Sequence, residues 1–223
     1  MGAIDRVDAA SGSSRRIGHV SDYHKARRGC LPSLGHMTNT ITIFTGRADR
    51  FSRIVAGVGS RWDDPSPCEG WTAADVVRHV IDTERDFLVR HGLLDTTPPA
   101  TNDPAEAWRA HLSDVAQALA TGGVAERPYD GYFGPTTIGD TMADFYGWDL
   151  VVHGWDIARA TGQDGPITDD DARTLGAIAD GWGAALHSPG VCAPALPIPD
   201  GATPVERLLA RLGRDPHWTA PGS

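Results

Sequence analysis

The chain has 223 residues, of which 40% are hydrophobic and 22% charged, and this composition predicts one globular domain with a substantial core. Its formal net charge of −9 argues against nucleic acid and anionic membranes as partners, because both attract a basic surface. The three cysteines form no C-x-x-C pair, which fits neither a disulfide framework nor a thiolate zinc site, so a cytoplasmic protein is expected. No apolar run approaches the roughly 20 residues of a membrane helix, and no signal-peptide core begins the chain.

Residues 1–36 differ from the rest of the chain, because they are polar, rich in turn formers and basic. We expect a disordered extension here, with Met37 as a natural start of the protein, and a functional basic arm is the alternative. The remainder predicts a single helical metal-binding domain over residues 37–218, followed by a short tail at 219–223.

Three amphipathic helices are predicted first. In the first, apolar residues recur at three- and four-residue spacing from Ile41 to Val58. The second opens at Thr72, where Asp75 completes a variant of the capping box. The third has Asp103 at its N-cap, proline at its first position and a Gly-Gly pair after its end.

A tyrosine- and glycine-rich connection leads to a fourth helix over about Ile138–Thr161. A fifth is predicted from Thr168 to about Leu186, and a proline-rich loop separates it from a last helix that starts at Thr203. Strand signals are nearly absent. The fold class is therefore predicted as all-α, a four-helix bundle with two shorter helices packed alongside.

The fourth helix contains an unusual polar trio. Asp149 and His153 are four residues apart and share one face, and Asp156 borders the same face. At 100° per residue that face also holds apolar residues: Met142, Phe145, Tyr146, Val152 and Ile157. The trio therefore points inward and must be paired, hydrated or bound to a metal. Spacing leaves two readings open, a carboxylate–imidazole clamp for a metal and a simple His–Asp hydrogen bond.

A third metal ligand has to come from another helix, and the candidates are His79, Glu84 and His111. On a helical wheel Glu84 lies near the middle of the apolar arc of the second helix, whereas His79 lies off its centre. Periodicity thus favours Glu84 as the polar group that points inward, where it could act as a base, a metal ligand or the partner of an arginine. The alternative is that Glu84 lies near the end of the bundle and reaches water.

Two stretches, "SPCEGWTAADVVRHVIDTERDFL" and "WDLVVHGWDIARATG", followed by "LLARLGRDPHW", resemble the actinobacterial branch of the DinB-like superfamily. That branch is related to the metal-binding domain of mycothiol-dependent maleylpyruvate isomerase, and the resemblance covers about residues 38–218. It implies a DinB-like four-helix bundle with one divalent metal, whose ligands correspond here to His79, Asp149 and His153. The isomerase has glutamate at the position of Asp149 and a second domain, whereas the residues after Gly162 predict two helices and a loop.

The resemblance implies a metal-dependent thiol S-transferase or isomerase-like enzyme that acts on a small-molecule thiol and an electrophile, with mycothiol as a candidate co-substrate. Zinc is the expected ion, with nickel, iron and manganese as alternatives. The competing hypotheses are a non-catalytic metal-binding or dimerising stress-response bundle and a purely structural His–Asp pair, and a homodimer stays open.

Several neighbouring residues receive roles in this scheme. Asp156 is expected either to fix the tautomer of a ligand imidazole or to pair with Arg159 or another arginine, and Glu84 and Asp156 are the catalytic candidates. Tryptophans Trp148 and Trp155 are expected to pack outside the polar face. Tyr132 and Phe133 are expected at the mouth of the pocket.

Overall fold

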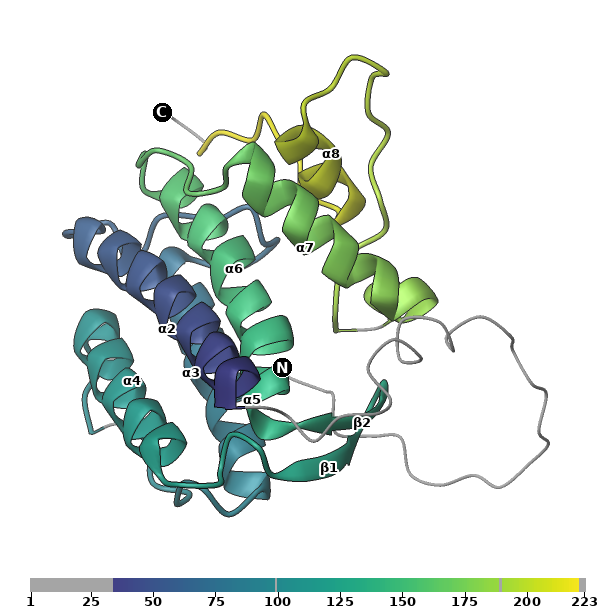
Figure 1. The fold of residues 1–223 in the computed structure, drawn as a ribbon. Helices are drawn as coiled ribbons and strands as arrows, with labels where there is room; N and C mark the ends of the chain where they lie inside the picture. The colour runs from purple at the N-terminus through teal and green to yellow at the C-terminus, as the bar shows by residue number, and fades with distance from the viewer. Residues whose placement is uncertain (1–33, 99, 189, 221–223) are drawn as a thin grey trace, which may run out of the picture. The chain divides into compact units, whose positions relative to one another are not determined.

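The computed structural model describes residues 34–98, 100–188 and 190–220. Four helices form a closed ring in which α2 and α3 each contact both α4 and α6 (Figure 1). Their bounds are Leu34–Gly57 for α2, Ala73–Arg90 for α3, Pro104–Ala120 for α4 and Gly147–Ala160 for α6. The predicted all-α four-helix bundle is confirmed.

The helix starts follow the local signals in the sequence. Thr72 and Asp75 form a reciprocal capping box at the start of α3, and the Asp103 side chain accepts from the first amides of α4. Because such caps satisfy backbone donors that the helix leaves unpaired, they fix where each helix begins.

Two features of the segment between α4 and α6 were not predicted. A two-stranded antiparallel hairpin, β1 (Pro128–Gly131) and β2 (Gly134–Thr137), replaces the expected irregular connection. The predicted fourth helix is also not regular, because a π-helical turn, η1 (Met142–Tyr146), separates the short α5 (Ile138–Thr141) from α6. A π turn adds a residue to the helical register, so the faces before and after it do not follow one 100° wheel.

The π turn is stabilised from outside the helix. The Gly147 amide donates to the Met142 carbonyl, five residues back, and Arg47 of α2 donates to the Ala143 carbonyl at 2.7 Å. A side chain from a neighbouring helix thus satisfies a carbonyl at the interruption.

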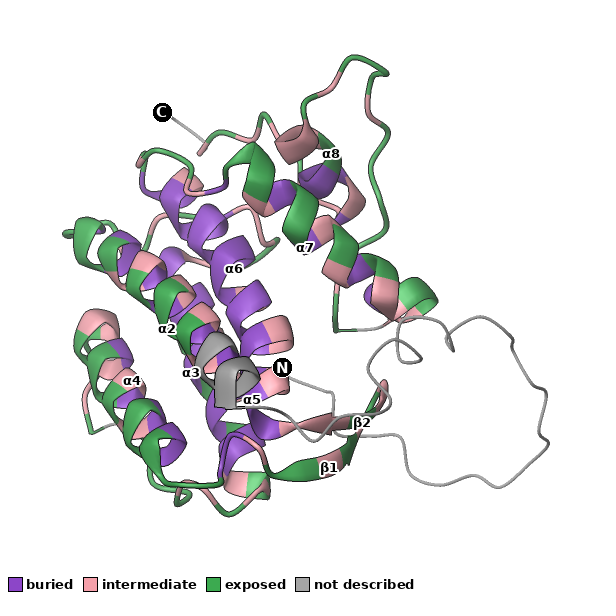
Figure 2. Ribbon diagram, viewed as in Figure 1, coloured by how far each residue is buried: buried purple, intermediate pink, exposed green. Residues whose placement is uncertain are grey.

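The core lies inside the ring of helices, with α6 at its most buried position. Every residue of α6 except Asp149 and Arg159 is buried, whereas α4 exposes its outer face (Figure 2). Trp108 of α4 is 1% exposed, contacts the Phe51 ring edge-on and donates its indole N–H to Ser52 at 2.8 Å. Packing against α2 and α3, more than helix propensity, therefore holds α6 in place.

The chain divides into two compact units, and the bundle belongs to the unit of residues 34–168 and 217–223. In residues 169–216, α7 (Asp169–Trp182), the 3₁₀ turn η2 (Gly183–His187) and α8 (Pro204–Arg211) are present, and Arg211 pairs with Asp180 at 2.7 Å. Two additional helices were expected after the bundle. Whether residues 37–218 fold as a single domain stays a prediction.

At the N-terminal end, α2 begins at Leu34, so the last three residues of the expected 1–36 extension are helical. Residues 1–33 lie outside the described residues, as do residues 221–223 of the predicted tail. Among the described helices, none is long and apolar enough to cross a membrane.

Candidate metal centre

Three of the predicted site residues come together between α3 and α6. His79 projects from α3, and Asp149 and His153 project from successive turns of α6. One ligand atom from each residue lies within 4.8 Å of the ligand atoms of the other two. His153 Nε2 lies 3.4 Å from Asp149 Oδ1, and the two imidazole centroids are 5.2 Å apart at an interplanar angle of 76°.

Burial places this cluster at the edge of the bundle core. The His153 side chain is 8% exposed and that of Asp149 is 24% exposed, while His79 is half-buried. The off-centre position of His79 on the helical wheel is consistent with this arrangement, because a site at the seam between two helices uses flanking positions. The cluster therefore has one side in the protein interior and one side toward solvent.

Asp156 supports the ring of His153 from behind. Its Oδ2 lies 2.9 Å from His153 Nδ1, and the Asp156 side chain is fully buried. A neutral imidazole that donates from Nδ1 to this carboxylate presents the Nε2 lone pair toward Asp149 and His79. Of the two roles expected for Asp156, the structure favours the one that fixes a tautomer, and Arg159 instead donates to the Trp218 carbonyl at 3.1 and 2.5 Å.

The electrostatic environment of His153 attracts a cation. Burial alone would lower the pKa of this imidazole, but the negative charge of Asp149 and the hydrogen bond to Asp156 outweigh burial and raise the pKa well above its ordinary value. The carboxylates thus favour a positive charge at the ring.

The donor set fits a divalent ion. Two imidazoles and one carboxylate are a ligand combination that zinc takes in catalytic sites, where three protein ligands leave a position to a small molecule. The same nitrogen and oxygen donors suit nickel, iron and manganese. A divalent ion at His79, Asp149 and His153 would take the place of the proton that His153 otherwise holds.

Two residues near the cluster were missed by sequence reasoning. Cys68 lies in the loop before α3, and its Sγ is 3.2 Å from Asp156 Oδ2, so that Cys68, Asp156 and His153 form a second cluster of donor atoms within 4.8 Å of one another. Trp71 contacts the ring of His79 at 4.8 Å between centroids and that of His153 at 6.4 Å. Neither contact has a helical spacing that would reveal it in the sequence.

Glu84 and His111 pair with each other, and neither belongs to the cluster of His79, Asp149 and His153. Glu84 Oε2 lies 2.8 Å from His111 Nε2, and the two side chains are 1% and 0% exposed. The alternative in which Glu84 reaches water is therefore wrong, and its partner is a histidine of α4, not an arginine. A catalytic role for Glu84 stays a prediction.

The aromatic residues near the fourth helix divide by burial. Trp148 and Trp155 are each 4% exposed, as expected for packing residues, and Arg159 lies over the Trp155 ring at 5.9 Å. Tyr132 is 75% exposed and contacts Phe133 at the hairpin turn, and the hairpin meets α3 through Tyr129 and Phe87. That Tyr132 and Phe133 line the mouth of the pocket stays a prediction.

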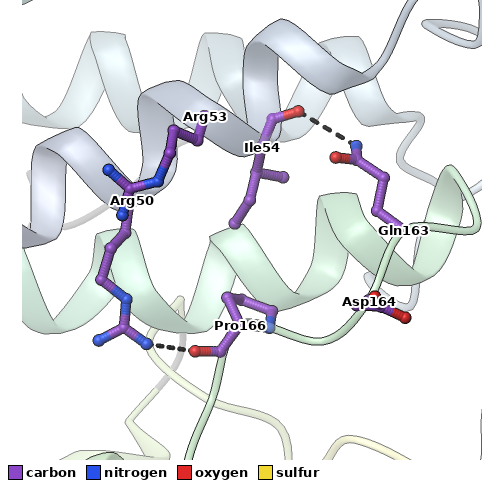
Figure 3. A pocket seen from close by; sticks show the side chains of 6 residues that line it. All are labelled: Arg50, Arg53, Ile54, Gln163, Asp164 and Pro166. Carbon is purple, nitrogen blue, oxygen red and sulfur yellow. Dashed lines mark hydrogen bonds between the residues drawn. The ribbon is translucent and has the colours of Figure 1, made fainter.

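A surface pocket of about 410 Å³ lies elsewhere on the bundle, between α2 and the segment after α6 (Figure 3). Arg50 donates to the Pro166 carbonyl and Gln163 donates to the Ile54 carbonyl at 3.1 Å, so both contacts fasten this segment to α2. The full lining is Arg50, Arg53, Ile54, Gln163, Asp164 and Pro166. None of these is a member of the metal cluster, and the pocket is therefore not the candidate centre.

Comparison with known proteins places this geometry in a family. The model of the mycothiol maleylpyruvate isomerase N-terminal domain matches residues 44–158, which is just over half of the chain and includes all three candidate ligands. The uncharacterized protein Rv0738 of Mycobacterium tuberculosis is 29% identical over 174 residues, covering 74% of this chain and 92% of the relative. The uncharacterized protein Rv0036c of the same organism is 27% identical over 147 residues, covering 54% of this chain and 56% of the relative.

No solved structure matches the chain significantly. The matched residues run from α2 to α6 and so include the two helices that carry His79, Asp149 and His153. The chain belongs to the mycothiol maleylpyruvate isomerase N-terminal domain family.

Proposed function

We propose that this protein binds one divalent metal ion, zinc in the first place, through His79, Asp149 and His153, and uses it in thiol-dependent group transfer or isomerisation of a small electrophile. The observation that carries the proposal is the convergence of these three side chains from two helices, with Asp149 and His153 on one face of α6. Mycothiol is the co-substrate that the family suggests.

A bound divalent ion supplies Lewis-acid chemistry, which lowers the pKa of a thiol or water and yields a nucleophile at neutral pH. The residues of the chain have separate tasks around it. His79, Asp149 and His153 would hold the ion, and the Asp156 carboxylate would keep the Nδ1 proton of His153 so that Nε2 faces the site. The Trp71 ring lies beside both imidazoles, and we expect it to limit the access of water to that side of the site.

Metal analysis tests the first half of the proposal. Purified protein should contain about one zinc per chain by mass spectrometry, and His79→Ala should lose it. His187→Ala is the matched control, since His187 is exposed and its Nδ1 bonds the Ala193 carbonyl. The site is contradicted if His79→Ala still contains about one metal ion per chain. It is also contradicted if wild type contains no metal and His153→Ala is as stable as wild type.

Cobalt substitution tests the second half. Titration of mycothiol or a simpler thiol into the cobalt form should produce a sulfur-to-cobalt charge-transfer band if the thiol enters the coordination sphere. A metal-loaded protein that shows no band across a range of thiols instead supports the alternative of a non-catalytic metal-binding bundle.

A further inference from the structure

The loop that precedes α3 is held in one conformation by its own backbone. The Ser66 amide donates to the Trp71 carbonyl at 2.8 Å, and the Trp71 amide donates to the Cys68 carbonyl at 3.0 Å. Gly70 sits at φ +78° in the resulting turn, a conformation that favours glycine. The Cys68 amide also donates to Ser66 Oγ at 3.2 Å, so the position of Cys68 is fixed before its side chain makes any contact.

The side chain of Cys68 reaches across to α6. Its Sγ donates to Asp156 Oδ2 at 3.2 Å, over a separation of 88 residues in sequence. The same carboxylate oxygen accepts from His153 Nδ1 at 2.9 Å. Because Asp156 is fully buried, its orientation depends on such partners and not on water.

The loop also reaches the other imidazole of the candidate site. Trp71, three residues after Cys68, contacts His79 at 4.8 Å and His153 at 6.4 Å between ring centroids. This one loop therefore meets both histidines of the metal cluster through the Trp71 ring, and it meets His153 a second time through the Cys68–Asp156 hydrogen bond.

We infer that Cys68 is a positioning residue of the metal site, which holds His153 in its ligating orientation through Asp156. The inference rests on the proposed metal site. Loss of an outer partner of a ligating histidine typically weakens metal binding about 10- to 100-fold. Since S–H is a weak donor, the effect of removing it should lie near the lower end of that range.

The test compares zinc affinity, by competition with a chromophoric chelator, in wild type, Cys68→Ala, Cys68→Ser and Cys192→Ala. Cys68→Ala should bind zinc about tenfold more weakly. Cys68→Ser keeps a hydroxyl donor for the carboxylate and should stay within about threefold of wild type. Cys192→Ala lies in the other compact unit and should match wild type.

A second measurement reads the orientation of His153 directly. In the metal-free protein, the Nδ1 proton shared with Asp156 should give a slowly exchanging NMR signal in wild type and in Cys68→Ser, and this signal should weaken or vanish in Cys68→Ala. If Cys68→Ala acted only by loosening the fold, its helical content would fall below that of wild type. An unchanged helical content, together with recovery of the Nδ1 signal in Cys68→Ser, would show that the hydrogen-bond donor at position 68 is responsible.

The two readouts separate the possible failures. Wild-type zinc affinity in Cys68→Ala, with an unchanged Nδ1 signal, overturns the inference while leaving the metal site intact. A wild-type protein that takes up no zinc refutes the metal site itself, and the Nδ1 signal then decides whether Cys68 orients the His153–Asp156 pair.

Discussion

Replacing one partner of the buried Glu84–His111 pair should destabilise the bundle far more than replacing both. His111→Leu leaves a carboxylate that is 1% exposed without its partner at Oε2, and among the described atoms Oε1 already has no hydrogen-bond partner. An uncompensated buried charge costs about 3–5 kcal/mol in free energy of unfolding. Glu84→Leu leaves an imidazole that is 0% exposed with both nitrogens unpaired, at about 1–3 kcal/mol for each.

The double variant Glu84→Leu/His111→Leu removes every one of these polar atoms and keeps similar side-chain volume. Its free energy of unfolding should lie within about 1 kcal/mol of wild type or exceed it, because well-packed apolar residues often replace buried pairs without loss. The large difference between the double variant and the sum of the two single variants measures the coupling within the pair.

The single variant His111→Leu should also lose stability over a wider pH range than wild type, in which the pKa of Glu84 is already raised. Burial raises the pKa of Glu84, the hydrogen bond from His111 opposes the rise, and repulsion from Asp149 adds to it. Without His111 the pKa of the folded state rises further above the ordinary value of 4.5. The folded protein then holds a proton that the unfolded chain has lost, so stability is greatest below the ordinary value. It falls by about 1.4 kcal/mol per pH unit as pH rises toward the raised pKa.

Guanidinium unfolding followed by circular dichroism at about pH 5 and about pH 8 measures both effects. The double variant, which lacks the carboxylate, is the control for the pH slope. The reasoning is refuted if the double variant is as unstable as the sum of the single variants, or if His111→Leu is equally stable at both pH values.

Three further predictions concern the metal cluster and the helix that carries His79. Asp156→Asn should weaken zinc binding by about 10- to 100-fold in a chelator competition, because the neutral amide holds the Nδ1 proton less strongly and can turn its own N–H toward the ring. Unchanged affinity would contradict the role of Asp156. Because the pKa of His153 is raised, zinc must displace a proton, so affinity should rise with pH until that raised pKa is passed; a flat profile would mean that His153 is not a ligand. Thr72→Ala removes the capping box with Asp75 and should lower the free energy of unfolding by about 1 kcal/mol in thermal or denaturant melts, and an unchanged midpoint would show the cap to be dispensable.

The starts of these helices were predictable from the sequence because an N-terminal cap involves residues that are close together in the chain. Thr72 with Asp75, and Thr203 with Glu206, satisfy backbone donors within three residues, so the sequence alone reveals them. The π turn and the hairpin were not predictable in this way. The carbonyl of Ala143 is satisfied by Arg47, 96 residues away, and no local pattern reports such a contact.

In the candidate site too, contacts between residues close in sequence were predictable, whereas contacts between distant segments were not. The spacing of Asp149 and His153 was readable because residues four apart share a helical face. His79 came from the family resemblance, since periodicity favoured Glu84, which proves to be the buried partner of His111. The contact of Cys68 with Asp156 joins a loop to a helix far along the chain, so only the folded structure reveals it.

The burial of α6 has a kinetic consequence. All residues of α6 except Asp149 and Arg159 are buried, and the helix contacts both α2 and α3. Its amides should therefore exchange with solvent only when the whole bundle opens. Two of the three candidate ligands therefore stay aligned when no ion is present, whereas the third comes from the neighbouring helix α3, beside a loop. If these side chains bind an ion as proposed, its release and recapture would need only local motion where α6 meets α3, and both would occur many times during the lifetime of a single folded molecule.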